Sequence, residues 1–352
     1  LTGTKRKKMK CFNPTYYLLT ILCIMIASCT TDGVMEDFTD SKGQILVKDA
    51  HINFVLTFPA NPSTRASENE GLESERSINN LHIYTFQNDQ FVEEIQYIVI
   101  DGKDGDTKRN IDGKLSATYD GSKPMEFVVI ANAENKGVNN FKITKGQNKA
   151  ALYKQLSFNF DKTQDWSKEI PMWGLGTINN IKTGGNNFGA LDLIRAVAKV
   201  NVTVANGTGL KNFEITEIRL HNYNTKGYCA PTVSNGPSIP ANSTIAGASE
   251  YLTSGTLSGN QGNKFENKFY IPEHKNIGIT NNDKKVCLTI NAKVREVEKT
   301  YTVQFSTNGK AYNALRNHLY VFNITSVDKV TSSLTYEVKQ WEYVTVDIPA
   351  FN

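Results

Sequence analysis

The chain has 352 residues, of which 39% are hydrophobic, and a formal net charge of +4. This length predicts about two domains, and the apolar content suffices for packed cores, which excludes a disordered chain. Residues 1–65 hold 8 of the 39 Lys and Arg residues and 5 of the 35 Asp and Glu residues. The rest of the chain is therefore nearly balanced, with 31 basic and 30 acidic residues. That balance argues against a nucleic-acid-binding surface.

Residues 1–28 have the pattern of an export signal. The cationic stretch KRKKMK, in which Met9 is a candidate initiator, precedes an apolar run of about 13 residues. This run is too short to span the ~30 Å hydrocarbon core of a bilayer. It ends in the small residues Ala27 and Ser28 before Cys29, as in a bacterial lipobox. We therefore predict lipidation of Cys29, including palmitate; the alternative is an ordinary signal peptide.

Processing of this kind leaves two of the five cysteines, Cys229 and Cys287, in the exported chain. An oxidising compartment permits a disulfide between them. Both also fit as small buried hydrophobic residues. The sequence does not choose between these two states.

Alternation of apolar and polar residues dominates the sequence and predicts an all-β protein. The first clear strand is INFVLTF, residues 52–58. Its apolar face carries Ile52, Phe54, Leu56 and Phe58. Prolines end the strand, and the loop that follows, NPSTRASENEG at 61–71, contains Arg65 and then Ala66. Such an arginine is either an ordinary loop residue or a site of cleavage.

Further strands are expected at LHIYTF, FVEEIQYIVI and EFVVIANA, with a short helix at 148–156. Residues 161–190 are rich in Gly and Asn and read as a long connection. A second half opens at LIRAVAKVNVTV, and residues 222–264 are expected to form surface loops. Strands return at KVCLTINAKVR, KTYTVQFS and HLYVFNITSV. Two β-sandwiches that meet near residue 190 are the simplest architecture.

The last segment again alternates. Its apolar residues change phase near Lys339 and Gln340, which a β-bulge would explain. They are Leu334, Tyr336, Val338, Trp341, Val344, Val346 and Ile348. The chain thus begins and ends with strands that have the pattern of half-buried sheet edges.

No catalytic constellation is apparent. G-x-S-x-G, H-E-x-x-H, C-x-x-C and phosphate-binding glycine loops are missing from the sequence. The acidic stretch DGKDGD at 101–106 lacks the spacing of an EF-hand and is better explained as a hairpin turn than as a calcium site. We predict no enzyme activity, no cofactor and no metal.

Several stretches occur together in the order of one known family. They are YTFQNDQFVEE, FVVIANAE, IPMWG, LIRAVAKVNVTV, FYIPEH, LRNHLYVFNIT and YEVKQWEYVTVDIP. With the lipobox, they make the chain resemble the FimA-type major fimbrial subunits, also called fimbrillins or type V pilins. The resemblance extends from about residue 45 to the C-terminus. It implies two tandem β-sandwich domains of the transthyretin-like type.

The resemblance implies the following division of the chain: a signal peptide at 1–28, a propeptide at 29–65, an N-terminal sandwich at 66–190 and a C-terminal sandwich at 191–352. The precursor would reach the outer membrane as a lipoprotein. An extracellular Arg-specific or trypsin-like protease would then cut between Arg65 and Ala66, and the product would enter a fimbrium. Arg76 and Lys48 are competing cleavage sites.

Cutting there removes Ile52, Phe54, Leu56 and Phe58 and would leave a groove for strand addition. The C-terminal region from Leu334 to Ile348 would fill the groove of the next subunit, so copies of the chain would assemble head to tail as a shaft. Alternatively, the last strand completes its own sandwich. Anchor and tip subunits are further expected partners.

Three alternatives to a shaft subunit remain open. The first is a fimbrial anchor or tip subunit, of which an anchor keeps its lipid. The second is a surface glycan-binding lipoprotein, for which Tyr251 and Tyr270 lie in or near the loop-rich region. The third, a lipidated hydrolase, lacks a catalytic constellation.

Overall fold

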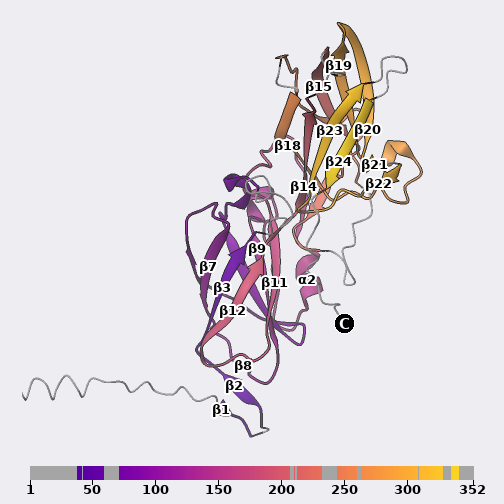
Figure 1. The fold of residues 1–352 in the computed structure, drawn as a ribbon. Helices are drawn as coiled ribbons and strands as arrows, with labels where there is room; N and C mark the ends of the chain where they lie inside the picture. Colours follow the sequence, from indigo (N-terminus) through magenta and orange to yellow (C-terminus); the bar gives the residue numbers. More distant parts are fainter. Residues whose placement is uncertain are drawn as a thin grey trace, which may run out of the picture. The chain divides into compact units, whose positions relative to one another are not determined.

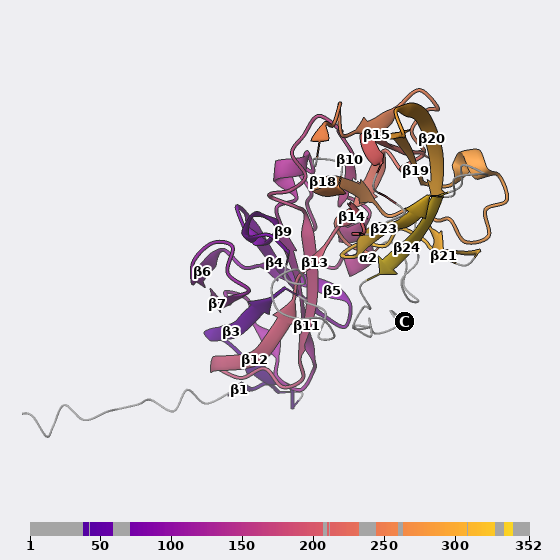
Figure 2. The same ribbon diagram turned by 45° about the horizontal axis from the view of Figure 1, so that its top comes forward.

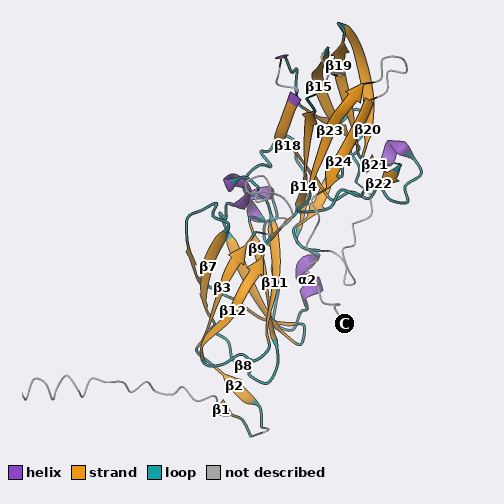
Figure 3. Ribbon diagram, in the orientation of Figure 1, coloured by secondary structure: helices purple, strands orange, loops and turns teal. Residues whose placement is uncertain are grey.

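Strands are the dominant secondary structure among the residues that the computed structural model describes (Figure 3), which confirms the predicted all-β class. The structure describes residues 38–41, 43–58, 71–206, 210, 212–231, 244–259, 263–307, 309–327 and 334–340. They all belong to one compact unit, residues 37–352. Among them, no helix is long and apolar enough to cross a membrane.

Two sheets form the part of the fold that precedes residue 196 (Figure 1). The five-stranded sheet has the order β13-β11-β9-β4-β5, with β13 at Ile194–Arg195, β11 at Met172–Ile178, β9 at Met125–Ala131, β4 at Leu81–Gln87 and β5 at Gln90–Glu94. The four-stranded sheet has the order β12-β3-β7-β6, with β12 at Gly184–Asp192, β3 at Ala50–Thr57, β7 at Lys108–Lys114 and β6 at Tyr97–Asp101.

A hydrophobic core includes the inward faces of these two sheets. Phe54 of β3 and Phe127 of β9 meet there with ring centroids 5.1 Å apart. Gly176 of β11 faces the Phe127 ring so closely that any Cβ at this position would overlap it. The glycine therefore makes room for the aromatic ring, against which Phe54 packs from the inward face of β3.

Two further sheets follow (Figure 2). One has the order β18-β14-β23-β24, with β18 at Lys264–Pro272, β14 at Val197–Val204, β23 at Leu319–Val327 and β24 at Leu334–Gln340. The other has the order β17-β15-β19-β20, with β17 at Tyr251–Thr253, β15 at Phe213–His221, β19 at Cys287–Val294 and β20 at Val297–Gln304. Their shared core includes Val200, Ile218, Ile290 and Phe322.

Smaller elements complete the described fold. A small sheet has the order β1-β2-β8, with β1 at Phe38–Thr39, β2 at Ile45–Val47 and β8 at Tyr119–Asp120. β10, at Ser157–Asn159, pairs with β16, at Lys226–Tyr228, and β21, at Ser306–Thr307, pairs with β22, at Lys310–Ala311. The helical elements are α2 at Lys149–Tyr153, η1 at Glu73–Arg76, η2 at Glu134–Lys136 and η5 at Asn282–Lys284.

The expected long connection at 161–190 was wrong, because it contains β11 and most of β12. The reason lies in the composition of β12, GGNNFGALD, whose Gly and Asn residues have low strand propensity. Parallel pairing with β3 supplies the order that local propensity lacks. The predicted boundary residue, Ala190, lies inside β12, and the strands of the second pair of sheets begin at Val197.

Other local predictions are confirmed. The expected short helix is α2, and its N-cap Asn148 accepts a hydrogen bond from the Ala151 N–H at 3.0 Å. The described parts of 222–264 are mainly loops with two short strands. The pairing of β10 with β16 connects the two halves of the chain, so the division into two domains stays a prediction.

We expect Phe54→Ala to lower the free energy of unfolding by about 3–5 kcal/mol, because it leaves a cavity against Phe127. Val55→Thr, on the opposite and half-buried face of the same strand, should cost about 0.5 kcal/mol. Urea denaturation followed by circular dichroism measures both changes. Equal losses in the two variants would contradict the assigned orientation of β3.

Candidate functional site

β3 lies inside its sheet, so the prediction of a sheet edge at the start of the chain was wrong. It pairs in parallel with β12, from Ala50 opposite Gly184 to Thr57 opposite Asp192. On its other side it pairs antiparallel with β7, from His51 opposite Lys114 to Thr57 opposite Lys108. Alternation shows that a strand has one buried face but not how many neighbours its backbone has. In Figure 1, β3 accordingly lies between β12 and β7.

The predicted inward face of this strand is buried. Ile52, Phe54 and Leu56 are 0% exposed and Phe58 is 4% exposed. These side chains pack into the core together with Ile83, Ile111, Phe127, Val129 and Leu191. The pattern of the sequence thus identified the buried residues correctly. Whether the strand is removable stays a prediction.

Sequence reasoning missed β1 and β2, which precede β3. β2 pairs with β8, and Val47 is fully buried. The short apolar run ILV at 45–47 was the available signal. The described part of the predicted propeptide therefore contributes Val47 and Ala50 to the core in addition to the four apolar residues of the predicted strand.

Cys29, Arg65 and Ala66 lie outside the described residues, but both competing cleavage sites are described. Arg76 is buried: its Nε donates to the Gly105 carbonyl at 2.8 Å and its Nη1 to the Gly71 carbonyl at 2.5 Å. Lys48 is exposed and lies between β2 and β3, outside any strand. A protease must extend the chain around its target, which disfavours Arg76.

Directly after the predicted cleavage loop, the chain is fixed by a group of buried and half-buried charged and polar side chains. We call Glu75, Arg195, Lys199 and Tyr270 the junction cluster. Lys199 Nζ lies 2.7 Å from Glu75 Oε1, and the Tyr270 hydroxyl donates to the same oxygen at 2.5 Å. Arg195 Nε donates to the Glu75 carbonyl at 3.0 Å. The 3-10 helix η1 is thereby tied to β13, β14 and β18.

The charges of the junction cluster keep Glu75 ionised. Burial alone would raise the pKa of Glu75, but the Lys199 ammonium and the Arg195 guanidinium outweigh it and lower the pKa below its ordinary value. The cluster was missed from sequence. The two cations of LIRAVAKV, inside an otherwise apolar strand, were the signal that a buried partner exists.

At the other end of the chain, β24 pairs antiparallel with β23, from Leu334 opposite Val327 to Gln340 opposite Tyr320. It is the outermost strand of its sheet among the described residues. Leu334, Tyr336 and Val338 lie in this strand, whereas Trp341, Val344, Val346 and Ile348 lie outside the described residues. In this single chain the strand therefore occupies its own second pair of sheets, and donation to a neighbour stays a prediction.

Comparison with known proteins identifies the family of this chain. The family of fimbrillin-A associated anchor proteins Mfa1 and Mfa2 matches residues 48–347. The chain belongs to this family. No curated protein matches it. The membership shows a fimbrial protein and implies a cell-surface, structural role.

Solved structures share the fold of this Mfa1 and Mfa2 family member. A fimbrilin from Porphyromonas gingivalis is 15% identical, with a TM-score of 0.50, and the match covers 83% of this chain and 97% of that one. A protein from Parabacteroides distasonis assigned to cell adhesion is 15% identical, with a TM-score of 0.51, and the match covers 84% and 98%. One from Bacteroides eggerthii, also assigned to cell adhesion, has the same identity and TM-score, with 84% and 97% covered.

Other candidate sites in this family member are structural. The stretch DGKDGD forms the turn between β6 and β7, where Asp106 accepts from the Lys103 N–H at 2.8 Å and Asp104 pairs with Arg109 at 3.2 Å. No group of three metal-ligating side chains occurs among the residues that the structure describes.

The two cysteines among the described residues are not bridged. Cys229 and Cys287 are buried free thiols. Burial raises the pKa of Cys229 to about 12 and that of Cys287 to about 11. Because the thiolate is the reactive form, both behave as small hydrophobic residues at neutral pH.

We expect Glu75→Gln to lower the free energy of unfolding by about 3 kcal/mol at pH 7, because it leaves the half-buried Lys199 and Arg195 without the buried carboxylate that balances their charge. The folded pKa of Glu75 is lowered, so its contribution is present above the unfolded pKa of about 4.5 and is lost as the pH falls through the folded value. The wild-type and Glu75→Gln proteins should therefore converge in acid.

The matched control is Glu73→Gln in the same short helix, where the carboxylate is exposed and lies 4.0 Å from Lys103. Urea titrations at a series of pH values should show little change for this variant. A stability difference between wild type and Glu75→Gln that persists unchanged at pH 3 would contradict the role given to the carboxylate.

Proposed function

We propose that the chain is a shaft subunit of a cell-surface fimbria, exported as a lipoprotein through Cys29, cut after Arg65, and polymerised by strand exchange in support of adhesion. One observation carries this proposal. A strand that is buried and paired on both sides, β3, directly precedes the loop that contains Arg65. A single cut in that loop would separate β3 covalently from the fold around it.

The position of β3 supports replacement rather than simple loss. In the described sheet, β12 pairs with β3 and with no other strand. Removal of β3 would leave unpaired backbone groups on both β12 and β7, which face each other across the empty slot. The slot would also expose the contacts of four apolar side chains, worth about 6 to 12 kcal/mol of burial. An incoming strand of matching alternation restores both kinds of interaction.

The surroundings of the loop favour Arg65 as the cleavage site. Arg76 is buried in η1, and a cut at the exposed Lys48 would leave β3 attached to the subunit. After a cut at Arg65, the junction cluster still fixes Glu75 and hence the chain that follows the new N-terminus. Proteolysis would thus remove the propeptide without releasing the segment behind it.

The C-terminal segment is the proposed donor. β24 is paired with one neighbour, β23, whereas β3 is paired with two, so fewer backbone hydrogen bonds hold β24 in place. It carries the alternating residues Leu334, Tyr336 and Val338, and Trp341 would add a large apolar anchor. Transfer to the slot of a second copy creates a head-to-tail contact that propagates into a filament.

The intact precursor would be unable to accept this strand because its own β3 fills the slot. Cleavage therefore acts as the switch for assembly. The expected partners are other copies of the chain, anchor and tip subunits, and an Arg-specific or trypsin-like protease. The precursor would be held in the outer membrane by lipid, including palmitate, and the mature form would be part of the extracellular fimbrium.

An anchor subunit is the second candidate. The description of the matching family names anchor proteins. In the structure, β3 fills the slot and β24 lies in a sheet of its own chain, so the uncut protein needs no strand from a neighbour. An anchor would keep both β3 and the lipid on Cys29.

We expect Arg65→Ala to block maturation, so that the protein sheared from cells is a lipidated monomer that begins at Cys29. Wild-type protein should begin at Ala66 and form a ladder of polymers on mildly denaturing gels. N-terminal sequencing and mass spectrometry give the start, and labelling with a palmitate analogue gives the lipid. Arg76→Lys serves as the control and should mature normally. A wild-type fimbria with residues 29–65 still attached would identify an anchor instead.

We also expect deletion of residues 334–352 to give a processed but monomeric protein, because the donor is missing while the acceptor slot still forms. A shorter deletion of 341–352 keeps β24 and tests whether the remaining residues of the segment are needed. The oligomeric state after cleavage is measured by light scattering. Polymers formed by the longer deletion would show that another segment fills the slot.

A further inference from the structure

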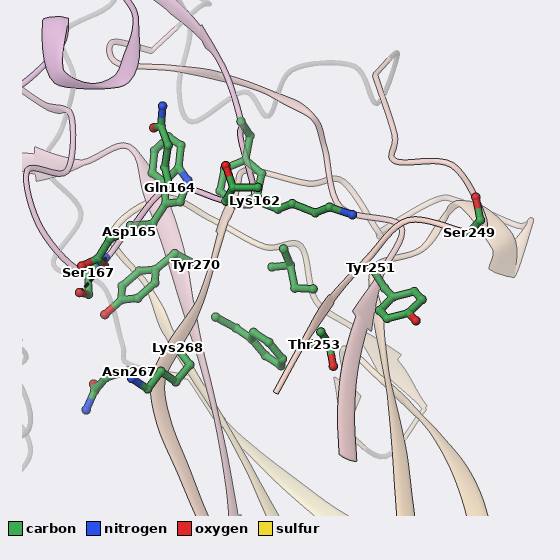
Figure 4. A pocket seen from close by; sticks show the side chains of 15 residues that line it. Lys162, Gln164, Asp165, Ser167, Ser249, Tyr251, Thr253, Asn267, Lys268 and Tyr270 are labelled. Carbon is green, nitrogen blue, oxygen red and sulfur yellow. Dashed lines mark hydrogen bonds between the residues drawn. The ribbon is translucent and has the colours of Figure 1, made fainter. Parts of the chain in front are cut away.

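A cleft of about 620 Å³ lies at the side of the second pair of sheets where β17 and β18 are the outermost strands. Figure 4 shows Gln164, Asp165 and Ser167 on one side of this cleft and Ser249, Tyr251 and Thr253 on the other. Most of these side chains offer hydroxyl, amide or carboxylate groups. The cleft is separate from the β3 slot.

The loop 161–167 that forms one wall is held in a single shape. Trp166 Nε1 donates to the Asp161 carbonyl at 2.8 Å, and the Trp166 ring stacks on Phe160 with centroids 4.7 Å apart. The Asp161 carboxylate accepts from both the N–H and the hydroxyl of Thr163, at 2.8 and 2.7 Å. A preformed wall costs little ordering entropy when a ligand binds.

A distortion in β18 shapes the wall that carries Asn267 and Lys268. Asn267 has φ of +60°, and its N–H donates to the buried Asn201 side chain at 3.0 Å instead of the strand ladder. The register between β14 and β18 shifts at this point. Such bulges re-aim side chains and interrupt the edge as a template for strand addition. A peptide strand is therefore disfavoured as the occupant.

The cleft has an excess of positive charge. Lys162 and Lys268 are exposed and form no ion pair among the described residues. Figure 4 shows Lys162 extended across the cleft toward Ser249 and Tyr251. The Asp165 carboxylate accepts from the Ser167 N–H at 2.9 Å and lies 3.6 Å from Lys168, so a neighbouring cation already balances its charge.

Tyr251 supplies an aromatic surface. Its ring is half-buried, with the Arg219 guanidinium 4.6 Å from its centroid and the His221 ring at 5.4 Å. These neighbours fix the ring beside the polar groups of the cleft. A fixed aromatic ring next to hydroxyls, amides and ammonium groups suits a ligand with a weakly polar ring face, many hydroxyl groups and negative charge.

We infer that this cleft binds an acidic saccharide, with Lys162 and Lys268 on its anionic groups and Tyr251 under a sugar ring. Such a site would give the surface protein a ligand of its own, independent of whether it is a shaft or an anchor subunit. Binding needs neither cleavage nor assembly, so failure of the site and failure of the proposed function can be told apart.

The test uses the intact chain and three probes of similar size: sulfated chondroitin oligosaccharides, neutral dextran oligosaccharides and oligoglutamate. Titration calorimetry should detect binding of chondroitin sulfate and of neither other probe. The double variant Lys162→Ala, Lys268→Ala should bind it at least about tenfold more weakly, and Tyr251→Leu about fivefold more weakly. The control Lys108→Ala, Lys182→Ala removes two exposed lysines elsewhere and should leave the affinity unchanged.

Trp166 lines the cleft, so the tryptophan fluorescence should change when the saccharide binds to the wild-type and control proteins. Equal loss of affinity in the control variant would mean that general charge causes the binding, and would overturn the site. If oligoglutamate binds as tightly as chondroitin sulfate, the ligand class is an acidic peptide, and the proposal of a saccharide ligand is overturned. Lack of binding to any probe would also overturn it.

Discussion

The two-sided pairing of β3 is the interaction on which the rest of the first pair of sheets depends. It supplies the ladder of β12, a strand of Gly and Asn residues with little propensity of its own, and it buries Ile52, Phe54 and Leu56 completely. Because hydrogen bonds on both sides and the apolar face act together, partial loss of this strand is unfavourable. The strand is therefore expected to stay in place as a unit unless another strand fills its position. That constraint supports the proposed proteolytic switch. After a cut in the following loop, β12 and β7 would still need a strand between them, but a neighbouring chain could supply it.

The junction cluster fixes the segment that follows the proposed cleavage site. A chain that is cut between two sheets acquires a new end, and a new end tends to fray. Here the segment that follows the loop is fixed within a few residues by Glu75, whose carboxylate meets Lys199 and Tyr270 in a buried environment. Buried charges of this kind are costly unless they are fully paired. Their position at η1 fixes the point at which the chain enters the fold. This point lies between the proposed propeptide and the rest of the subunit.

The proposed strand slot and the proposed saccharide cleft lie in different parts of the molecule. The slot is apolar and elongated, and it suits a β-strand. The cleft is polar and carries two ammonium groups, of Lys162 and Lys268, that form no ion pair within the described part of the chain, and its β18 wall is distorted at Asn267. Because the same distortion disfavours strand addition, the proposed cleft would not compete with the slot for donor strands. A protein that assembles through strands needs such protection at its other sheet edges.

The sequence by itself determined the fold class, the inward residues of the first strand, the short helix at 148–156 and the fimbrial resemblance. These follow from alternation, composition and short motifs, which are local properties and do not depend on which segments pack together. Tertiary structure alone decided that β3 lies between two strands, that the Gly- and Asn-rich segment at 184–192 is a strand, and that Glu75 meets Lys199 across more than a hundred residues. It also brought Tyr251 and Tyr270 to one cleft. These features depend on which distant segments pair. Pairing is set by the packing of whole sheets, so no local pattern encodes it.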